Sequence, residues 1–145
     1  MLLNDFLHHA NWLAIIVAAL TYFILGSLWF SVLFGKVWAA SHGIQMPTDE
    51  KAKAEMKKKM PAMFGLTFLM NVAMAIVVAM FVMALGSVKC MAAMKLGLAL
   101  SAIGCIPFMM SHLYLMKPFK VWVIDAGYHI VSITIMTIII SVWHH

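Results

Sequence analysis

Four long apolar runs constrain this chain more strongly than any other feature. Each is long enough, at about 1.5 Å per residue, to cross about 30 Å of hydrocarbon. In lipid every backbone N–H and C=O group needs a partner within the protein, and runs of this length without strand-like alternation meet that need as helices. The runs cover residues 12–34, 63–85, 96–116 and 121–143.

Composition excludes a water-soluble fold. Of the 145 residues, 65% are hydrophobic and only 10% are charged, which is more apolar surface than a soluble globule of this size can bury. The sequence therefore predicts an all-α membrane protein, a single domain covering residues 1–145, whose four transmembrane helices form an antiparallel bundle. Tryptophans near the ends of the runs are expected to anchor the helices in the headgroup layer; they are Trp12, Trp38, Trp122 and Trp143.

The distribution of lysine predicts the orientation in the membrane. All ten basic residues are lysines, and eight of them lie between the first and second runs or between the third and fourth. Only Lys89 and Lys95 lie in the remaining loop. Because basic residues concentrate in cytoplasmic loops, both termini are predicted to lie outside. The net charge of +5 is then explained by contact with anionic lipid at the cytoplasmic face, not by nucleic-acid binding.

A basic segment at residues 48–60 has the features of a short helix. Thr48 is followed by two acidic residues, which suit the positive end of a helix dipole. Ala52, Met56 and Met60 then recur every four residues, with lysines between them. We expect an amphipathic helix on the cytoplasmic membrane surface. A solvated charged loop is the alternative.

Small residues spaced by four mark two faces on which helices can pack closely. One set lies on the first run, at Ser27, Ser31 and Gly35, and the other on the third run, at Gly97 and Ser101. Such residues let helix backbones approach one another where the hydrophobic effect cannot drive association. The pattern does not distinguish contacts within the chain from contacts in a homo-oligomer or a larger membrane complex.

A polar layer is predicted within the membrane near the start of the fourth run. Asp125, Tyr128 and His129 fall on one face of a helix. The four-residue KPFK turn before this run fixes its register against the third run and puts His112 opposite Asp125. Asn71 of the second run comes to about the same depth. These five residues form the predicted polar cluster.

Two interpretations of this cluster remain open. An acid within a membrane is costly unless it is paired or neutralised, so it is a functional-site hypothesis by default. Asp125 with His112 and His129 could exchange a proton and support transport. The alternative is structural: Asp125 lies one turn from the interface, reaches Lys120 or lipid headgroups, and orders the bundle.

Metal, haem and enzymatic functions have little support in the sequence. Histidines, an acid, Cys105 and many methionines are suitable ligands, but no H-x-x-x-H or C-x-x-C pattern lies within a membrane run. The sequence also lacks G-x-S-x-G, H-E-x-x-H and a phosphate-binding glycine loop. We therefore predict no metal, no cofactor and no catalytic residue. His144 and His145 are consistent with the remnant of a purification tag.

Two stretches resemble the opening and closing signatures of a bacterial family of small membrane proteins catalogued as "domain of unknown function 1761". They are residues 11–38 and 124–143. The resemblance covers nearly the whole chain and implies four membrane helices, without an established activity. We expect the location to be a bacterial inner membrane. Its most specific elements are Gly26, Trp29, Phe34, Gly35, Lys36 and Trp38 at one end, and Tyr128 and His129 at the other.

Taken together, these features predict a non-enzymatic accessory or packing subunit, or a self-associating helical bundle. The alternative is a small proton-coupled transporter or permease that uses Asp125, His112 and His129. Four helices leave little room for a central path, so transport would require a homo-oligomer.

Overall fold

The computed structural model describes residues 3–43, 48–86 and 89–143, and most of these residues are helical. Four of the helices are long and apolar enough to cross a membrane, as predicted: Trp12–Leu33, Glu50–Ala84, Cys90–Tyr114 and Phe119–Val142. His144, His145 and Pro47 lie outside the described residues. The elements in chain order are α1 (Leu3–His9), α2 (Trp12–Leu28), the π-helical turn η1 (Trp29–Leu33), α3 (Gly35–Ser41), α4 (Glu50–Ala84), α5 (Cys90–Tyr114) and α6 (Phe119–Val142).

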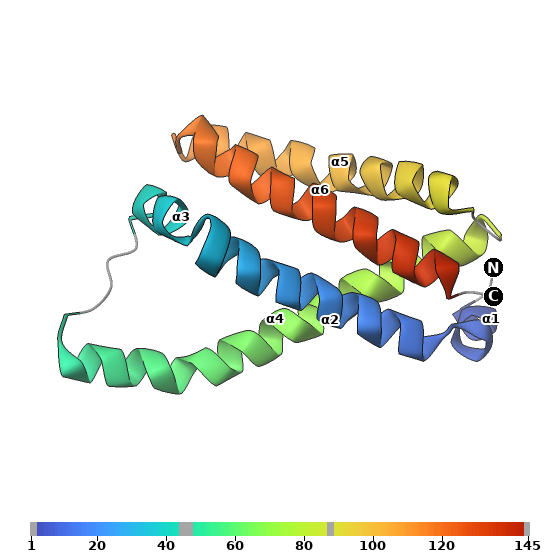
Figure 1. Ribbon diagram of the computed structural model, residues 1–145, viewed down its shortest axis with the longest axis horizontal. Helices are drawn as coiled ribbons and strands as arrows, with labels where there is room; N and C mark the ends of the chain where they lie inside the picture. The colour runs from blue at the N-terminus through green and yellow to red at the C-terminus, as the bar shows by residue number, and fades with distance from the viewer. Residues whose placement is uncertain (1–2, 44–47, 87–88, 144–145) are drawn as a thin grey trace.

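Helix α6 is the central helix. Half of its apolar window is buried, against 22–28% for the other three spans. It packs against α5, α2, α4 and α3, and Figure 1 shows it lying alongside α5 and α2. Side chains on α6 therefore have neighbours on several sides, whereas the outer faces of α4 and α5 carry exposed apolar side chains, which suit lipid.

Small residues bring α5 and α6 into close contact. A Cβ atom added at Gly97 would lie 2.7 Å from the Cα atom of Thr134, closer than real Cβ contacts. Ser101 is fully buried one turn further along, and its hydroxyl donates to the Gly97 carbonyl at 2.6 Å. The predicted stripe at Gly97 and Ser101 thus serves a contact within the chain. Glycine is needed there because any side chain would push the two backbones apart.

The second predicted stripe has a different environment. Ser27 and Ser31 are exposed, and each hydroxyl donates to the carbonyl four residues earlier in its own helix. Gly35 begins α3 after the π-helical turn, where an added Cβ atom would lie 2.9 Å from the Phe30 carbonyl oxygen. The turn ends the first span and brings α3 to the same end of the molecule as the α5–α6 turn (Figure 1).

Helix α4 differs from the predicted division of the chain. The helix begins at Glu50 and runs without a break past Pro61 to Ala84, so the predicted segment 48–60 and the span 63–85 form one helix. Its first eleven residues are exposed on all sides, and in Figure 1 this part leads away from the other helices. With 35 residues, α4 is about 52 Å long and exceeds the hydrocarbon thickness of about 30 Å.

An apolar core fills the end of the bundle that lies farthest from α3. Short α1, which was not predicted, inserts Phe6 into this core with 1% exposure. The Asn11 side-chain amide donates to the Trp143 carbonyl at 2.8 Å and joins the start of α2 to the end of α6. Among the buried members of this core from the long helices are Ile15, Ala18, Ala19, Val78, Val82, Met136 and Ile140.

Candidate functional site

Asp125 and His112 form the centre of a buried polar site. Asp125 is 5% exposed and His112 is 6% exposed. Their side chains come from the first turns of α6 and the last turns of α5, and His112 Nε2 lies 3.4 Å from Asp125 Oδ2. The structure thus places these two residues opposite each other, as the register of the KPFK turn predicts. Lys120, the other predicted partner of Asp125, is exposed.

Trp38 holds the second oxygen of the same carboxylate. Its indole Nε1–H donates to Asp125 Oδ1 at 2.9 Å. From its position in the sequence Trp38 was predicted to be a headgroup anchor, but the helical segment α3 turns it toward α6. A neighbouring indole makes a similar contact, because Trp29 Nε1–H donates to the Ile124 carbonyl at 3.0 Å. Two tryptophans, one from η1 and one from α3, therefore contact α6 beside the site.

His42 is the third ionisable residue of the site, and the sequence analysis did not identify it. It follows α3 directly, is half-buried, and its ring lies 4.4 Å from the Trp38 ring between centroids. One ligand atom each from His42, His112 and Asp125 lie within 4.8 Å of one another. We call His42, His112, Asp125 and Trp38 the Asp125 site.

Both imidazoles of the Asp125 site are held by their Nδ1 atoms. His112 Nδ1 lies 3.1 Å from the Phe108 carbonyl oxygen, and His42 Nδ1 lies 3.0 Å from the Trp38 carbonyl oxygen. A carbonyl can only accept, so in each ring Nδ1 carries the proton, and in a neutral ring Nε2 presents its lone pair. His112 Nε2 is buried without a hydrogen-bond partner among the described residues.

His129 and Tyr128 belong to a separate contact with α2. Tyr22 Oη and His129 Nδ1 are hydrogen-bonded at 2.6 Å, and the Tyr128 hydroxyl donates to the Tyr22 carbonyl at 3.1 Å. The two tyrosine rings meet edge to face with centroids 5.1 Å apart. His129 is therefore on the predicted face of α6, one turn from Asp125, but its hydrogen-bond partner is Tyr22.

Asn71 lies in a third environment, between α4 and α2. It is 8% exposed, and its Nδ2 atom has no hydrogen-bond partner within the described part of the chain. A groove of ≈ 240 Å³ runs past it. Asn71 therefore lines a groove together with Tyr128 and does not belong to the Asp125 site, although Asn71 and Asp125 were predicted in one layer. The groove is lined by Phe23, Gly26, Ser27, Phe30, Phe64, Thr67, Asn71 and Tyr128.

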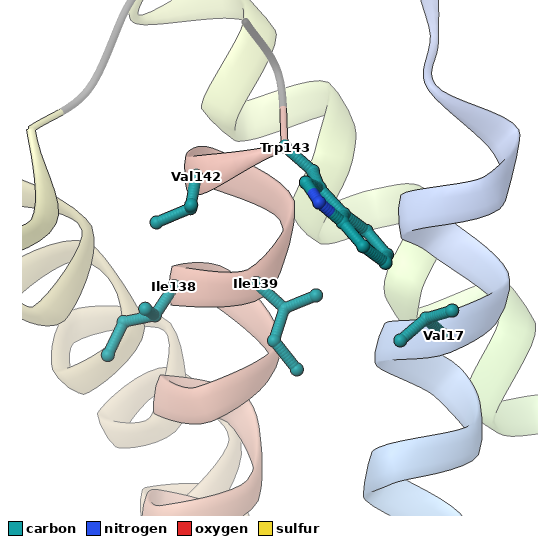
Figure 2. Close-up of a pocket in the computed structure, with 5 residues that line it drawn as sticks. All are labelled: Val17, Ile138, Ile139, Val142 and Trp143. Carbon is teal, nitrogen blue, oxygen red and sulfur yellow. The ribbon is translucent and has the colours of Figure 1, made fainter.

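The opposite end of the bundle carries an apolar groove of ≈ 300 Å³ between α6 and α2. Figure 2 shows Ile139 of α6 and Val17 of α2 pointing toward each other, with the Trp143 indole beside them. None of the described residues that line this groove is charged, so it suits a lipid chain. Its lining residues are Val17, Ile138, Ile139, Val142 and Trp143.

The sequence pattern that could have identified Trp38 and His42 is only a few residues long. Trp38 and His42 are spaced by four in VWAASH, and the residues between them include two alanines, which favour helix. That spacing puts both rings on one face of a helical turn. Nothing in the local pattern indicates that this turn folds back over α6, because the contact depends on the bend at η1.

The comparisons with known proteins place the chain in a family. The family model described as "Protein of unknown function (DUF1761)" matches residues 13–141. The chain therefore belongs to this family. No curated protein and no solved structure matches it.

Proposed function

We propose that this protein is a non-enzymatic accessory subunit embedded in a membrane. The protein binds a small ligand at the Asp125 site, which the ligand reaches from one face of the bilayer. One observation carries the proposal: ionisable side chains from three separate segments, His42, His112 and Asp125, converge with ligand atoms within 4.8 Å of one another. A single pair would be enough to neutralise the acid.

A purely structural role explains this site less well. Buried polar atoms normally have hydrogen-bond partners, because each orphan has a desolvation cost. In the described part of the chain His112 Nε2 has none, and its 3.4 Å approach to Asp125 is an ion pair only if the ring is protonated. An incompletely satisfied cluster weakens a bundle unless something else completes it. A ligand that forms a hydrogen bond or a coordination bond with His112 Nε2 would complete the cluster.

Transport across the membrane is the less supported alternative. Beyond the Asp125 site the buried core is mostly apolar and includes Ala18, Val78 and Ile140. A buried hydroxyl at that end, Thr137, donates to the Ile133 carbonyl of its own helix at 2.7 Å and offers no relay to another segment. These features favour binding at one face over a proton-coupled permease.

The lysine distribution supports a cytoplasmic location for the site. In an antiparallel bundle the α5–α6 turn, α3 and the basic start of α4 share one face, with both termini at the other. The positive-inside rule then puts the Asp125 site at the cytoplasmic face of a bacterial inner membrane. The exposed lysines of residues 50–60 would contact anionic lipid there, whether that part lies on the surface or projects from it.

Self-association is a second candidate, favoured by one observation. Ser27 and Ser31 are exposed on α2 and η1 while their hydroxyls are satisfied within the helix. A second copy could approach this face closely. Ser31→Cys in a Cys90→Ser background should then cross-link on mild oxidation in membranes. A uniformly monomeric product would contradict self-association through this face.

Access from one face can be tested with thiol labelling of the full chain in sealed vesicles. His42→Cys should react with a membrane-impermeant maleimide from the side that holds the basic part of α4. Native Cys90, exposed at the start of α5, is the matched control for the opposite side. Cys105 is buried and provides the baseline. An unreactive thiol at 42, or one that reacts from the Cys90 side, would contradict the proposal.

A further inference from the structure

We propose that the Asp125 site binds a divalent transition-metal ion through His42 Nε2, His112 Nε2 and a carboxylate oxygen of Asp125. This inference deepens the proposed function, since it names the ligand and rests on access from the adjacent aqueous phase. The sequence analysis predicted no metal, because the three residues share no local motif. The fold alone brings them together, from the end of α3, the end of α5 and the start of α6.

The distances fit an ion of this class. In a tetrahedral site with metal–ligand distances of about 2.0–2.2 Å, two ligand atoms are separated by about 3.3–3.6 Å. His112 Nε2 and Asp125 Oδ2 are 3.4 Å apart. One ligand atom from each of the three residues lies within 4.8 Å of the others, so the largest closure required is about 1.5 Å against that ideal spacing. His42, half-buried at the end of a seven-residue helix, is the ligand with the most freedom to move.

The atoms behind the ligands are also arranged as in metal sites. Histidine ligands in proteins commonly donate their second ring N–H to a carbonyl or carboxylate, which fixes the tautomer and the direction of the lone pair. Here His42 uses the Trp38 carbonyl at 3.0 Å and His112 the Phe108 carbonyl at 3.1 Å. Trp38 Nε1 does the same for the carboxylate, at 2.9 Å from Oδ1. Each of the three side chains is therefore also held by a hydrogen bond at an atom that would not contact the metal.

The hydrogen bonding of His112 Nε2 also favours an ion at this place. His112 Nε2 is buried and has no hydrogen-bond partner in the described ranges 3–43, 48–86 and 89–143. Coordination would satisfy this lone pair and would also neutralise the Asp125 carboxylate. One dication would thus remove the two costs that burial of His112 and Asp125 imposes on the bundle.

The donor set selects the class of metal. Two imidazoles and one carboxylate suit Zn²⁺ or Fe²⁺ and leave coordination positions open for water. Mg²⁺ and Ca²⁺ prefer oxygen ligands throughout, and only one of these ligands supplies oxygen. Ions that prefer thiolate ligands fit less well, because the site offers no thiol: Cys105 is not among the converging groups. Its thiol donates toward the Ala126 carbonyl of α6 at 3.9 Å.

Titration with Co²⁺, a spectroscopic substitute for Zn²⁺ and Fe²⁺, tests the inference directly. The full chain is purified without a polyhistidine tag and placed in lipid nanodiscs. We expect one equivalent of Co²⁺ to bind with visible ligand-field absorption and to be displaced by Zn²⁺. His42→Ala and Asp125→Asn should each weaken binding by more than about 100-fold, since losing a mere hydrogen bond to a ligand costs about 10- to 100-fold. Trp38→Phe should weaken Co²⁺ binding by this smaller factor of about 10 to 100.

Matched histidine variants separate this site from adventitious binding. His129→Gln removes a half-buried imidazole on the same helix, and His8→Gln with His9→Gln removes exposed imidazoles of α1; all should retain the absorption. Absence of binding in the native chain would overturn the inference, as would a signal lost only with His8 and His9. If Asp125→Asn fails to fold, His42→Ala decides, because His42 is half-buried at a helix end.

The two proposals fail in different ways. If the thiol of His42→Cys reacts from the predicted face but the native chain binds neither Co²⁺ nor Zn²⁺, the metal inference is wrong and binding of another ligand stands. If that thiol is unreactive and no metal binds, both are wrong. If metal binds while the thiol is unreactive from either face, the site is metal-binding but the proposed access from water is wrong.

Discussion

The two ends of this bundle are held together differently although α6 passes through both. At the end near α1, buried alanine, valine and isoleucine side chains fill the space between helices, and Phe6 completes the core. At the end near α3, side-chain hydrogen bonds join separate segments, as from Trp38 to Asp125 and from Tyr22 to His129. Apart from the hydrogen bond from Asn11 to the Trp143 carbonyl, close packing holds the helices together at the end near α1. The polar groups at the other end need a reason beyond cohesion.

Hydroxyl groups in the packed region support this contrast. Thr137 and Ser101 are fully buried, and each donates to a carbonyl of its own helix, at 2.7 and 2.6 Å. Their hydroxyl groups are hydrogen-bonded within the same helix, and both side chains are small. His112 does the same with Nδ1 but leaves Nε2 directed at another segment. Buried polar atoms without a hydrogen-bond partner also occur among the described packing contacts, at Ser132 Oγ and Thr134 Oγ1. What distinguishes His112 Nε2 is that it faces the carboxylate of another helix at 3.4 Å.

The largest effect on stability is expected at the apolar end. Phe6→Ala removes a side chain that is 1% exposed, and the cavity should lower the free energy of unfolding by about 3–5 kcal/mol. Reversible unfolding in mixed micelles followed by circular dichroism measures this change. Leu7→Ala, at a position 47% exposed, is the control and should change little. If Phe6→Ala lowers the free energy of unfolding as little as Leu7→Ala does, α1 does not contribute to the core.

A smaller loss is expected where α5 meets α6. Gly97→Val adds a side chain at a position where even Cβ would lie 2.7 Å from Thr134 Cα, and such overpacking costs about 1–3 kcal/mol. Gly104→Ala on the same helix has nothing within 4 Å and should be neutral or slightly stabilising, because alanine favours helix. Unfolding midpoints of the two variants in the same micelles test this pair. A neutral Gly97→Val would contradict the close approach.

The smallest effect is expected at the Asp125 site in the absence of ligand. Asp125→Asn keeps an oxygen that accepts from Trp38 and removes only the charge, so the free energy of unfolding should change by less than about 1 kcal/mol. The same unfolding experiment, with chelator present, measures it. A loss as large as that of Phe6→Ala would make the site structural and remove the contrast between the two ends.

The sequence predicts the spans and one contact of the site, for physical reasons. Apolar runs show where lipid is crossed, and the short KPFK turn sets a register that puts His112 opposite Asp125, as the 3.4 Å separation confirms. The short segments α1 and α3 lie outside the apolar runs, and their positions depend on tertiary contacts. Phe6, Trp38 and His42 were therefore not assigned to the core or the site.

Helix α4 and His129 show a second limit. Charge composition separates residues 48–60 from the following apolar span, but backbone hydrogen bonding continues past Pro61 because helix formation does not require a uniform environment. Helical periodicity puts His129 on the same face as Asp125, yet a face of α6 is wide enough to contact two neighbours. The Tyr22 hydroxyl decides which of them His129 contacts.

The thermal unfolding midpoint with and without Zn²⁺ tests the central claim most directly. A ligand that binds only the folded state stabilises it by about 2.7 kcal/mol when its free concentration is 100 times Kd. The Tm of the tag-free chain should therefore rise with Zn²⁺, as should that of Leu7→Ala, while that of His42→Ala should not. An equal rise in His42→Ala, or none in the native chain, would contradict a metal ion at the Asp125 site.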